Sequence, residues 1–151
     1  MKYDLVIGSD HRGLTLKHKI ANWIMPTGAD VSSRFHIDII NDVGAHSDKS
    51  VDYPDIVKKF ATTKKVSGNG ILICGSGFGV SIAANRHKHI RAAVCRSVKD
   101  VQMARKHNDI NVLCIGADFT SFWQAKSLVR AFFNTQFEGG RHKKRIAKIS
   151  Q

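Results

Sequence analysis

Apolar residues along this chain follow two patterns, short continuous runs and a repeat of three to four residues. Five short runs rich in Val, Ile and Leu are typical of β-strands, and they lie at 3–10, 34–40, 70–74, 91–95 and 111–116. The segments between them place apolar residues on one helical face, which predicts helices over 11–25, 51–66, a stretch from about 80, 97–109 and 120–137. The polar stretch 41–50 is expected to be a loop, and a short basic helix is expected after a break at 138–140.

Local signals mark the starts of two of these helices. Pro54 falls in the first turn of the helix expected over 51–66, where a missing N–H costs no hydrogen bond. Ser97 is a suitable N-cap for the next-to-last long helix, and Asp100 stands at the position that completes a capping box.

Strands that alternate with helices are typical of α/β proteins with a parallel sheet. The run 70–74 is apolar at nearly every position, as expected of a parallel strand covered on both faces. We therefore expect a three-layer α/β/α, Rossmann-like fold around a five-stranded parallel sheet, in a single domain over residues 1–151.

Open α/β sheets bind ligands beyond the carboxyl ends of their strands. The residues that directly follow the expected strands are therefore the first candidates for a site. They lie at 9–11, 75–79, 96–97 and 116–118.

The stretch 75–79 reads GSGFG and separates an expected strand from an expected helix. Glycines let backbone N–H groups approach a ligand closely, and the helix adds its positive end. Such a loop suits a phosphate or an oxyanion. No Gly-Lys-Ser/Thr follows, the loop does not match GxGxxG cleanly, and glycine turns of this kind also occur for packing alone.

Cys74 stands at the mouth of this loop. A thiolate beside N–H donors can remove a proton from a carbon next to a carbonyl, and the donors stabilise the resulting enediolate. This is the chemistry of an aldose–ketose isomerase, although spacing alone favours a buried spectator. Cys95 and Cys114 are interpreted as small buried hydrophobes, because three cysteines without CxxC spacing favour neither a disulfide framework nor a zinc site.

Composition limits the partners and the compartment. The 151 residues are 42% hydrophobic and carry a formal net charge of +12, which favours anionic partners. No nucleic-acid-recognition motif accompanies the charge, so we expect no specific nucleic acid. No apolar run approaches a membrane span and no signal-peptide pattern precedes the first strand, so a soluble, cytoplasmic protein is expected.

Six stretches together resemble one known family. They are IGSDHRGLTLK (7–17), VDYPD (51–55), GILICGSGFGVSIAANR (70–86), IRAAVC (90–95), ARKHNDINVLCIGA (104–117) and FNTQFEGGRHKKRIAKI (133–149). The chain resembles ribose-5-phosphate isomerase of the B type, within a group that includes galactose-6-phosphate and allose-6-phosphate isomerases. The stretches run in the family's order over nearly the whole chain.

The resemblance implies catalytic roles. Cys74 matches the base that removes the proton at C2 of the opened sugar, and Ser76 matches a relay between O1 and O2. His107 matches the residue proposed to open the furanose ring, with Asn108 beside it as a donor. Backbone N–H groups of the loop would hold the enediolate, from Gly75, Gly77, Phe78 and Gly79.

The resemblance also implies substrate-binding roles. Asp10 would bind sugar hydroxyls, and Tyr53 and Asn85 would line the pocket. His11, Arg141 and Arg145 match groups that hold the phosphate. Other interpretations remain for three of these positions and for His107. Asp10 suits a helix cap, the two arginines suit a solvated basic face, and His107 suits the negative end of a helix.

The implied reaction interconverts D-ribose 5-phosphate and D-ribulose 5-phosphate through a cis-enediolate, in the non-oxidative branch of the pentose phosphate pathway. The alternatives are a six-carbon sugar phosphate such as allose 6-phosphate, or a non-catalytic module that binds an anion or nucleotide. No metal or organic cofactor is implied.

The family's site lies between subunits, which implies a homodimer or a tetramer of dimers, with the tail 138–151 reaching a partner subunit. Two features depart from the family pattern. Asp118 stands where many members have arginine, which leaves open whether Arg141 and Arg145 suffice for the phosphate or Arg96 replaces it. Residues 25–50 are longer and more irregular than usual.

Overall fold

A computed structural model describes residues 3–25, 35, 37–64 and 68–149. Within these residues a parallel five-stranded sheet has the strand order β2-β1-β3-β5-β4. The strands are β1 (Tyr3–Ser9), β2 (Ile37–Asp42), β3 (Asn69–Cys74), β4 (Ala92–Val94) and β5 (Val112–Gly116). The helices are α1 (Leu14–Ile24), α2 (Tyr53–Lys64), α3 (Phe78–Ala84), α4 (Val98–Asn108), α5 (Phe122–Asn134) and α6 (Arg141–Ile149).

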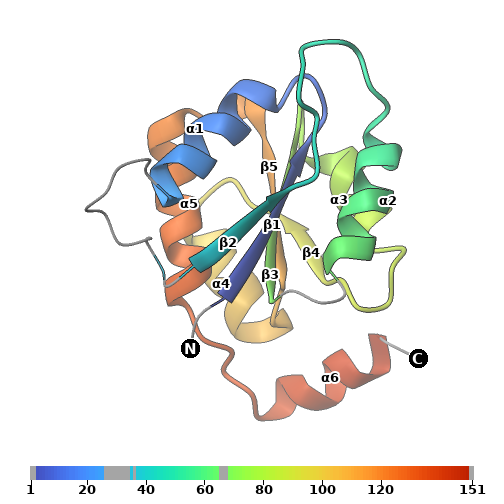
Figure 1. The fold of residues 1–151 in the computed structure, drawn as a ribbon. Helices are drawn as coiled ribbons and strands as arrows, with labels where there is room; N and C mark the ends of the chain where they lie inside the picture. The colour runs from blue at the N-terminus through green and yellow to red at the C-terminus, as the bar shows by residue number, and fades with distance from the viewer. Residues whose placement is uncertain (1–2, 26–34, 36, 65–67, 150–151) are drawn as a thin grey trace.

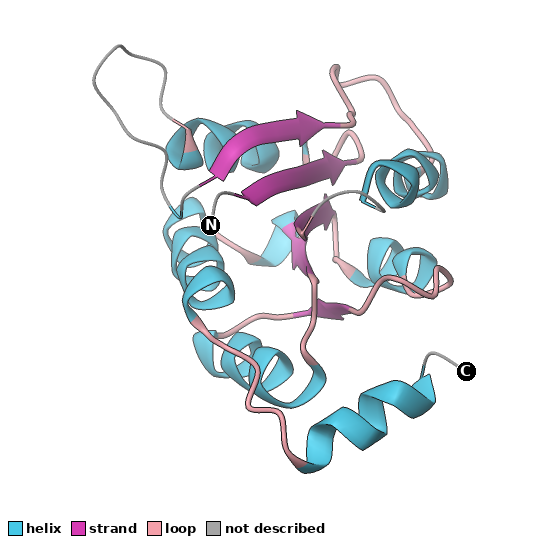
Figure 2. Ribbon diagram, turned by 60° about the horizontal axis from the view of Figure 1, so that its bottom comes forward, coloured by secondary structure: helices cyan, strands magenta, loops and turns pink. Residues whose placement is uncertain are grey.

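Helices cover both faces of the sheet, as the alternation of strands and helices predicts. Helices α1, α4 and α5 pack on one face, and α2 and α3 pack on the other (Figure 1). Helix α6 lies apart from both layers and touches the end of α4 (Figure 2). The prediction of a three-layer α/β fold is confirmed.

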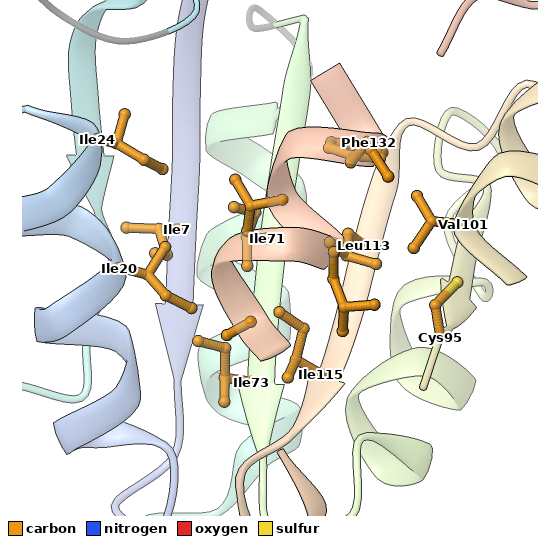
Figure 3. Close-up of a cluster of buried hydrophobic side chains, with 14 of the residues drawn as sticks. Ile7, Ile20, Ile24, Ile71, Ile73, Cys95, Val101, Leu113, Ile115 and Phe132 are labelled. Atoms are coloured by element: carbon orange, nitrogen blue, oxygen red, sulfur yellow. The ribbon is translucent and has the colours of Figure 1, made fainter. Parts of the chain in front are cut away.

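The strands divide their side chains between two cores. Ile71 and Ile73 of β3 join the core beneath α1, α4 and α5, whereas Leu72 and Cys74 join the core beneath α2 and α3. Figure 3 shows the first core, in which side chains of β1, β3 and β5 meet those of the covering helices. A strand with both faces buried has no polar alternation, which explains why its sequence is apolar throughout.

The expected bounds hold for most elements, and β2 is the main exception. The prediction put this strand at 34–40, but it runs to Asp42 into the stretch expected to be a loop. Asn41 and Asp42 pair with Val6 and Ile7 of β1, and tertiary pairing overrides their polar character. The expected start at residue 34 lies outside the described residues, as do residues 65–66 of the second expected helix.

Helix ends follow local chemistry. The predicted capping box of α4 is confirmed, because the Asp100 N–H donates to Ser97 Oγ at 3.0 Å and the Ser97 N–H donates to Asp100 Oδ2 at 2.9 Å. Helix α3 begins at Phe78 rather than about 80, and α5 ends at Asn134 rather than 137. None of the helices in the described part of the chain has the length and apolar character of a membrane span.

The topology gives the molecule two distinct edges. The carboxyl ends of the strands lead into 10–13, 75–77 and 117–119, at the top of Figure 1. The end of α4 and the whole of α6 lie at the opposite, amino edge, at the bottom of that view. Candidate site residues occur at both edges.

Candidate functional site

Cys74 is the last residue of β3 and is 4% exposed. Its Sγ accepts a hydrogen bond from the Gly77 N–H at 3.1 Å. Gly77 has a φ of +83°, a left-handed conformation that favours glycine and directs this N–H back toward the sulfur. A donor aimed at sulfur stabilises negative charge there, which is the requirement for a thiolate base.

Ser76 follows at the turn, and its Oγ accepts a hydrogen bond from the Phe78 N–H at 3.3 Å. The hydroxyl therefore lies at the start of α3, two residues after Cys74. Its own proton stays available for donation, since Oγ acts as the acceptor in this contact.

Close approaches fix the loop from two sides. A Cβ on Gly79 would lie 2.7 Å from Cζ of the Tyr53 ring, so the missing side chain lets α2 place its tyrosine across the loop. A Cβ on Gly116 would lie 2.5 Å from the backbone oxygen of Ser76. The packing interpretation of the loop glycines is therefore correct for Gly79, because α2 could not come so near a bulkier loop. Gly116 belongs to β5, and its missing side chain lets the loop approach that strand.

Arg12 and Asp118 form an ion pair beside the loop, with Arg12 Nη2 2.5 Å from Asp118 Oδ2. A Cβ on Gly75 would lie 2.9 Å from Arg12 Nε, and the Asp118 N–H donates to the Gly75 oxygen at 3.0 Å. Arg12 was not predicted as a site residue, since it stands 106 positions from its partner Asp118. The guanidinium places a cation at the mouth of the loop.

The Arg96 side chain contacts two aromatic rings. Its guanidinium lies 5.3 Å from the centre of the Phe78 ring and 4.6 Å from that of Phe119. Both rings are more than half exposed. The cation that pairs with Asp118 is therefore Arg12, and Arg96 is held by aromatic faces.

Asp10 follows β1 and is 7% exposed. Its Oδ1 accepts hydrogen bonds from the Arg12 and Gly13 N–H groups, each at 3.0 Å. The carboxylate thus closes the turn that precedes α1. The N-cap residue of α1 is Gly13, so Asp10 stabilises the turn before the helix rather than capping the helix as predicted. That role also fixes the carboxylate at the carboxyl edge of the sheet.

His11 is oriented by the segment that precedes α2. The Val51 N–H donates to His11 Nδ1 at 3.2 Å. Nδ1 is then the acceptor, so a neutral ring carries its proton on Nε2. Asp10, His11, Tyr53 and the loop 75–79 are all brought to one edge by the fold.

The other predicted residues lie at the opposite edge. His107 and Asn108 end α4, and Arg141 and Arg145 lie on α6. Cys74 pairs in register with Gly116 at the far end of β5, and four steps of roughly 3.3 Å along this strand separate the edges by about 13 Å. A single chain therefore does not bring these residues to Cys74.

His107 belongs to a small cluster of titratable groups. Its Nε2 lies 3.6 Å from Glu138 Oε2, and His142 Nε2 lies 3.8 Å from the same oxygen. The two imidazole rings stack, with centres 4.5 Å apart. Burial lowers the pKa of His142, and the nearby charges of His107, Arg141 and Arg145 lower it further.

The sequence profile of the family described as Ribose/Galactose Isomerase matches residues 5–149. This chain is a member of the ribose/galactose isomerase family. Ribose-5-phosphate isomerase B of Escherichia coli is 39% identical over 149 residues, which cover 97% of this chain and 93% of that protein. A putative sugar phosphate isomerase of Rickettsia bellii is 41% identical, with 97% of both chains covered.

Solved structures of family members have the same fold. Ribose 5-phosphate isomerase B of Thermotoga maritima is 38% identical, with a TM-score of 0.88 and 99% of both chains covered. Ribose-5-phosphate isomerase B of Mycoplasma genitalium with bound ribulose-5-phosphate is 36% identical, with a TM-score of 0.87, 99% of this chain covered and 95% of that one.

In this ribose/galactose isomerase, Asn85 ends α3 and is fully engaged with backbone. Its Nδ2 donates to the Ser81 and Ala92 oxygens at 3.0 and 2.8 Å, and its Oδ1 accepts from the Ala92 N–H at 2.9 Å. It joins α3 to the edge strand β4. Together with Asn108 and Ile149 it lines a cavity of about 350 Å³, which lies away from the Cys74 loop.

The other two cysteines of this family member are buried and free, as expected. Burial raises the pKa of Cys95 to about 12, and the charge of Asp100 adds to this effect. Burial likewise raises the pKa of the Cys114 thiol. Neither thiol supplies a thiolate near neutral pH, which leaves Cys74 as the candidate base.

Proposed function

We propose that this chain is an aldose–ketose isomerase that interconverts D-ribose 5-phosphate and D-ribulose 5-phosphate. The observation that carries the proposal is the thiol of Cys74, held at 3.1 Å by the Gly77 N–H at the mouth of a glycine loop. The full-length similarity to ribose-5-phosphate isomerases B supports the same substrate, because one such relative is described with ribulose-5-phosphate bound.

The reaction follows from the groups at this edge. The Cys74 thiolate removes the proton from C2, the C2–H electron pair becomes the C1–C2 double bond, and O1 takes the negative charge. Ser76 transfers a proton from O2 to O1. The electron pair of O2 then forms the C2 carbonyl, and C1 takes the proton back from the thiol.

Backbone donors stabilise the charged intermediate. We place the enediolate oxygens within reach of the N–H groups at 75–79, where the Gly77 and Phe78 N–H groups otherwise donate to Cys74 Sγ and Ser76 Oγ. Each preorganised donor of this kind contributes roughly 100- to 1,000-fold in rate. Asp10 and Tyr53 contact the sugar, and His11 and Arg12 attract the phosphate from the same chain.

We further propose that a second copy completes the site. His107, Asn108, Arg141 and Arg145 lie about 13 Å or more from Cys74 in one chain, at the far ends of the strands. A two-fold dimer that apposes the amino edge of one chain with the carboxyl edge of the other joins both sets. Helix α6, which lies apart from the two helical layers, is the element that reaches across.

A mixing experiment tests the shared site. Cys74→Ala and His107→Ala are each expected to be inactive, whereas equal amounts refolded together regain about a quarter of the wild-type rate, because half of randomly paired dimers hold one intact site of two. Differently tagged subunits verify that mixed dimers form. Mixed dimers without activity would contradict a site shared between subunits.

Substrate choice has its own test. Ribose 5-phosphate and allose 6-phosphate are compared by kcat/KM on the same preparation. We expect a higher kcat/KM for ribose 5-phosphate. A higher kcat/KM for allose 6-phosphate would show that the preferred substrate is a six-carbon sugar phosphate.

A further inference from the structure

Three side chains that ligate metals converge at the amino edge of the sheet. They are His107, Glu138 and His142, and one ligand atom from each lies within 4.8 Å of the other two. It is the one group of three histidine, cysteine or acidic side chains with this spacing in the part of the chain that the structure describes. Neither Glu138 nor His142 has a role in the proposed isomerase site.

The backbone holds the three residues together. The Glu138 N–H donates to the Lys106 oxygen at 3.1 Å, which ties the start of the link to the last turn of α4. Gly139 and Gly140 both have positive φ, at +72° and +55°, so the chain reverses sharply there. The turn returns His142, in the first turn of α6, to stack on His107.

The donor set selects the class of metal. Two imidazoles and one carboxylate are typical ligands of Zn²⁺ and related transition-metal ions, whereas Mg²⁺ and Ca²⁺ require oxygen ligands. Tetrahedral ligands at about 2.1 Å stand about 3.4 Å apart, close to the 3.6 and 3.8 Å between Glu138 and the two imidazoles. The remaining adjustment falls on the two imidazoles, which stack with centres 4.5 Å apart and must turn their Nε2 atoms toward one ion; the His107 side chain, 36% exposed, is the one with room to turn.

We propose that His107, Glu138 and His142 bind a divalent transition-metal ion, with Zn²⁺ as the reference, and leave one coordination position open. The buried ring of His142 provides the fixed ligand, since its side chain is 8% exposed. Arg141 and Arg145 on the same helix oppose a cation, and the Glu138 carboxylate compensates. The site is therefore a regulatory one of moderate affinity rather than a structural centre.

Metal binding has a consequence for catalysis, and this part rests on the proposed function. An ion bound to His107 Nε2 removes this imidazole from the acid–base step of the proposed ring opening. The bound metal is then a reversible inhibitor of the isomerase. Binding itself does not depend on that function.

Direct titration tests the binding. Zn²⁺ is added to the purified, metal-free chain in a calorimeter, and Co²⁺ absorption reports the coordination geometry. We expect one ion per chain, and Glu138→Gln and His142→Ala each to weaken the affinity at least about tenfold, because each removes one of three ligands. The wild-type chain without one-to-one binding, or His142→Ala with wild-type affinity, would overturn the site.

Two matched controls exclude other metal ligands. His87→Ala removes one ring of the His87–His89 pair, and Cys74→Ala removes the candidate thiolate. Both are expected to bind Zn²⁺ as the wild type does. Loss of binding in either control would show that the metal binds at the substituted residue rather than at the proposed cluster.

Activity measurements separate the two proposals. We expect Zn²⁺ to inhibit the wild type and a chelator to restore its rate, while Glu138→Gln, compared with its own metal-free rate, resists inhibition. Normal isomerisation without Zn²⁺ binding refutes the metal site and leaves the function intact. Binding without inhibition keeps the site and refutes its effect on catalysis.

Discussion

Lys17 provides a quantitative test of how the carboxyl edge is held in place. Its side chain on α1 is completely buried, and Nζ donates to Asp42 Oδ1 and to the Ala45 oxygen, both at 2.6 Å. The Ala45 N–H in turn donates to the Ser9 oxygen at 2.5 Å. The ammonium therefore fastens the end of β2 and the segment that follows it to α1, and the Ala45 N–H fastens the same segment to the end of β1, directly before Asp10.

The expected cost of Lys17→Met follows from the burial of its partner. Removal of one member of a buried ion pair costs roughly 3 to 5 kcal/mol. Asp42 is 28% exposed and keeps a hydrogen bond from the Gly44 N–H, which reduces the penalty. Methionine fills most of the vacated volume, so we expect about 2 to 4 kcal/mol of lost unfolding free energy.

Urea denaturation measures this loss, and Lys19→Met is the matched control. Lys19 is exposed on the same helix, and its substitution is expected to change the free energy of unfolding by less than about 0.5 kcal/mol. Asp42→Asn combined with Lys17→Met is expected to cost less than the sum of the single changes. If Lys17→Met costs no more than Lys19→Met, the ion pair does not stabilise this edge.

Three further predictions address the site. Gly79→Ala is expected to lower kcat/KM at least about tenfold, or about 1.4 kcal/mol, because its Cβ would displace the Tyr53 ring; an unchanged steady-state rate would refute this. Asp118→Ala frees Arg12 and is expected to lower KM about two- to fivefold, whereas Arg12→Leu raises it; equal KM values in both variants would contradict a phosphate-binding Arg12. Burial lowers the pKa of His142 from 6.5, so the unfolded state binds the proton more tightly; the stability that neutral His142 contributes is present above pH 6.5 and lost below it. The difference in urea midpoint between wild type and His142→Gln should therefore shrink from pH 8 to pH 5, and a constant difference would refute the shift.

The sequence was sufficient where local chemistry decides the structure. The capping box of Ser97 and Asp100 needs only residues three apart, and the apolar run 70–74 specifies a strand covered on both faces. The end of β2 could not be predicted in this way. Its polar residues Asn41 and Asp42 become strand because β1 pairs with them and buried Lys17 neutralises the carboxylate.

The candidate site likewise combines features that local sequence predicts with features that depend on the folded chain. Cys74 and its loop are contiguous in the sequence and were predicted from it. Arg12 was missed, because its partner Asp118 comes beside it only after the strands assemble. The spacing of Glu138 and His142 by four residues was a readable signal, but their approach to His107 depends on the turn at 139–140.

Cys74 is the proposed base of a sugar-phosphate isomerase. The most direct test measures the conversion of ribose 5-phosphate to ribulose 5-phosphate by the wild type and by Cys74→Ala, with a chelator present to keep metals off the histidine cluster. Circular dichroism and urea midpoints verify that both proteins are folded alike. We expect rapid conversion by the wild type and a loss of at least about 1,000-fold, some 4 kcal/mol, in the variant. A folded Cys74→Ala protein that converts the sugar at the wild-type rate would contradict this role.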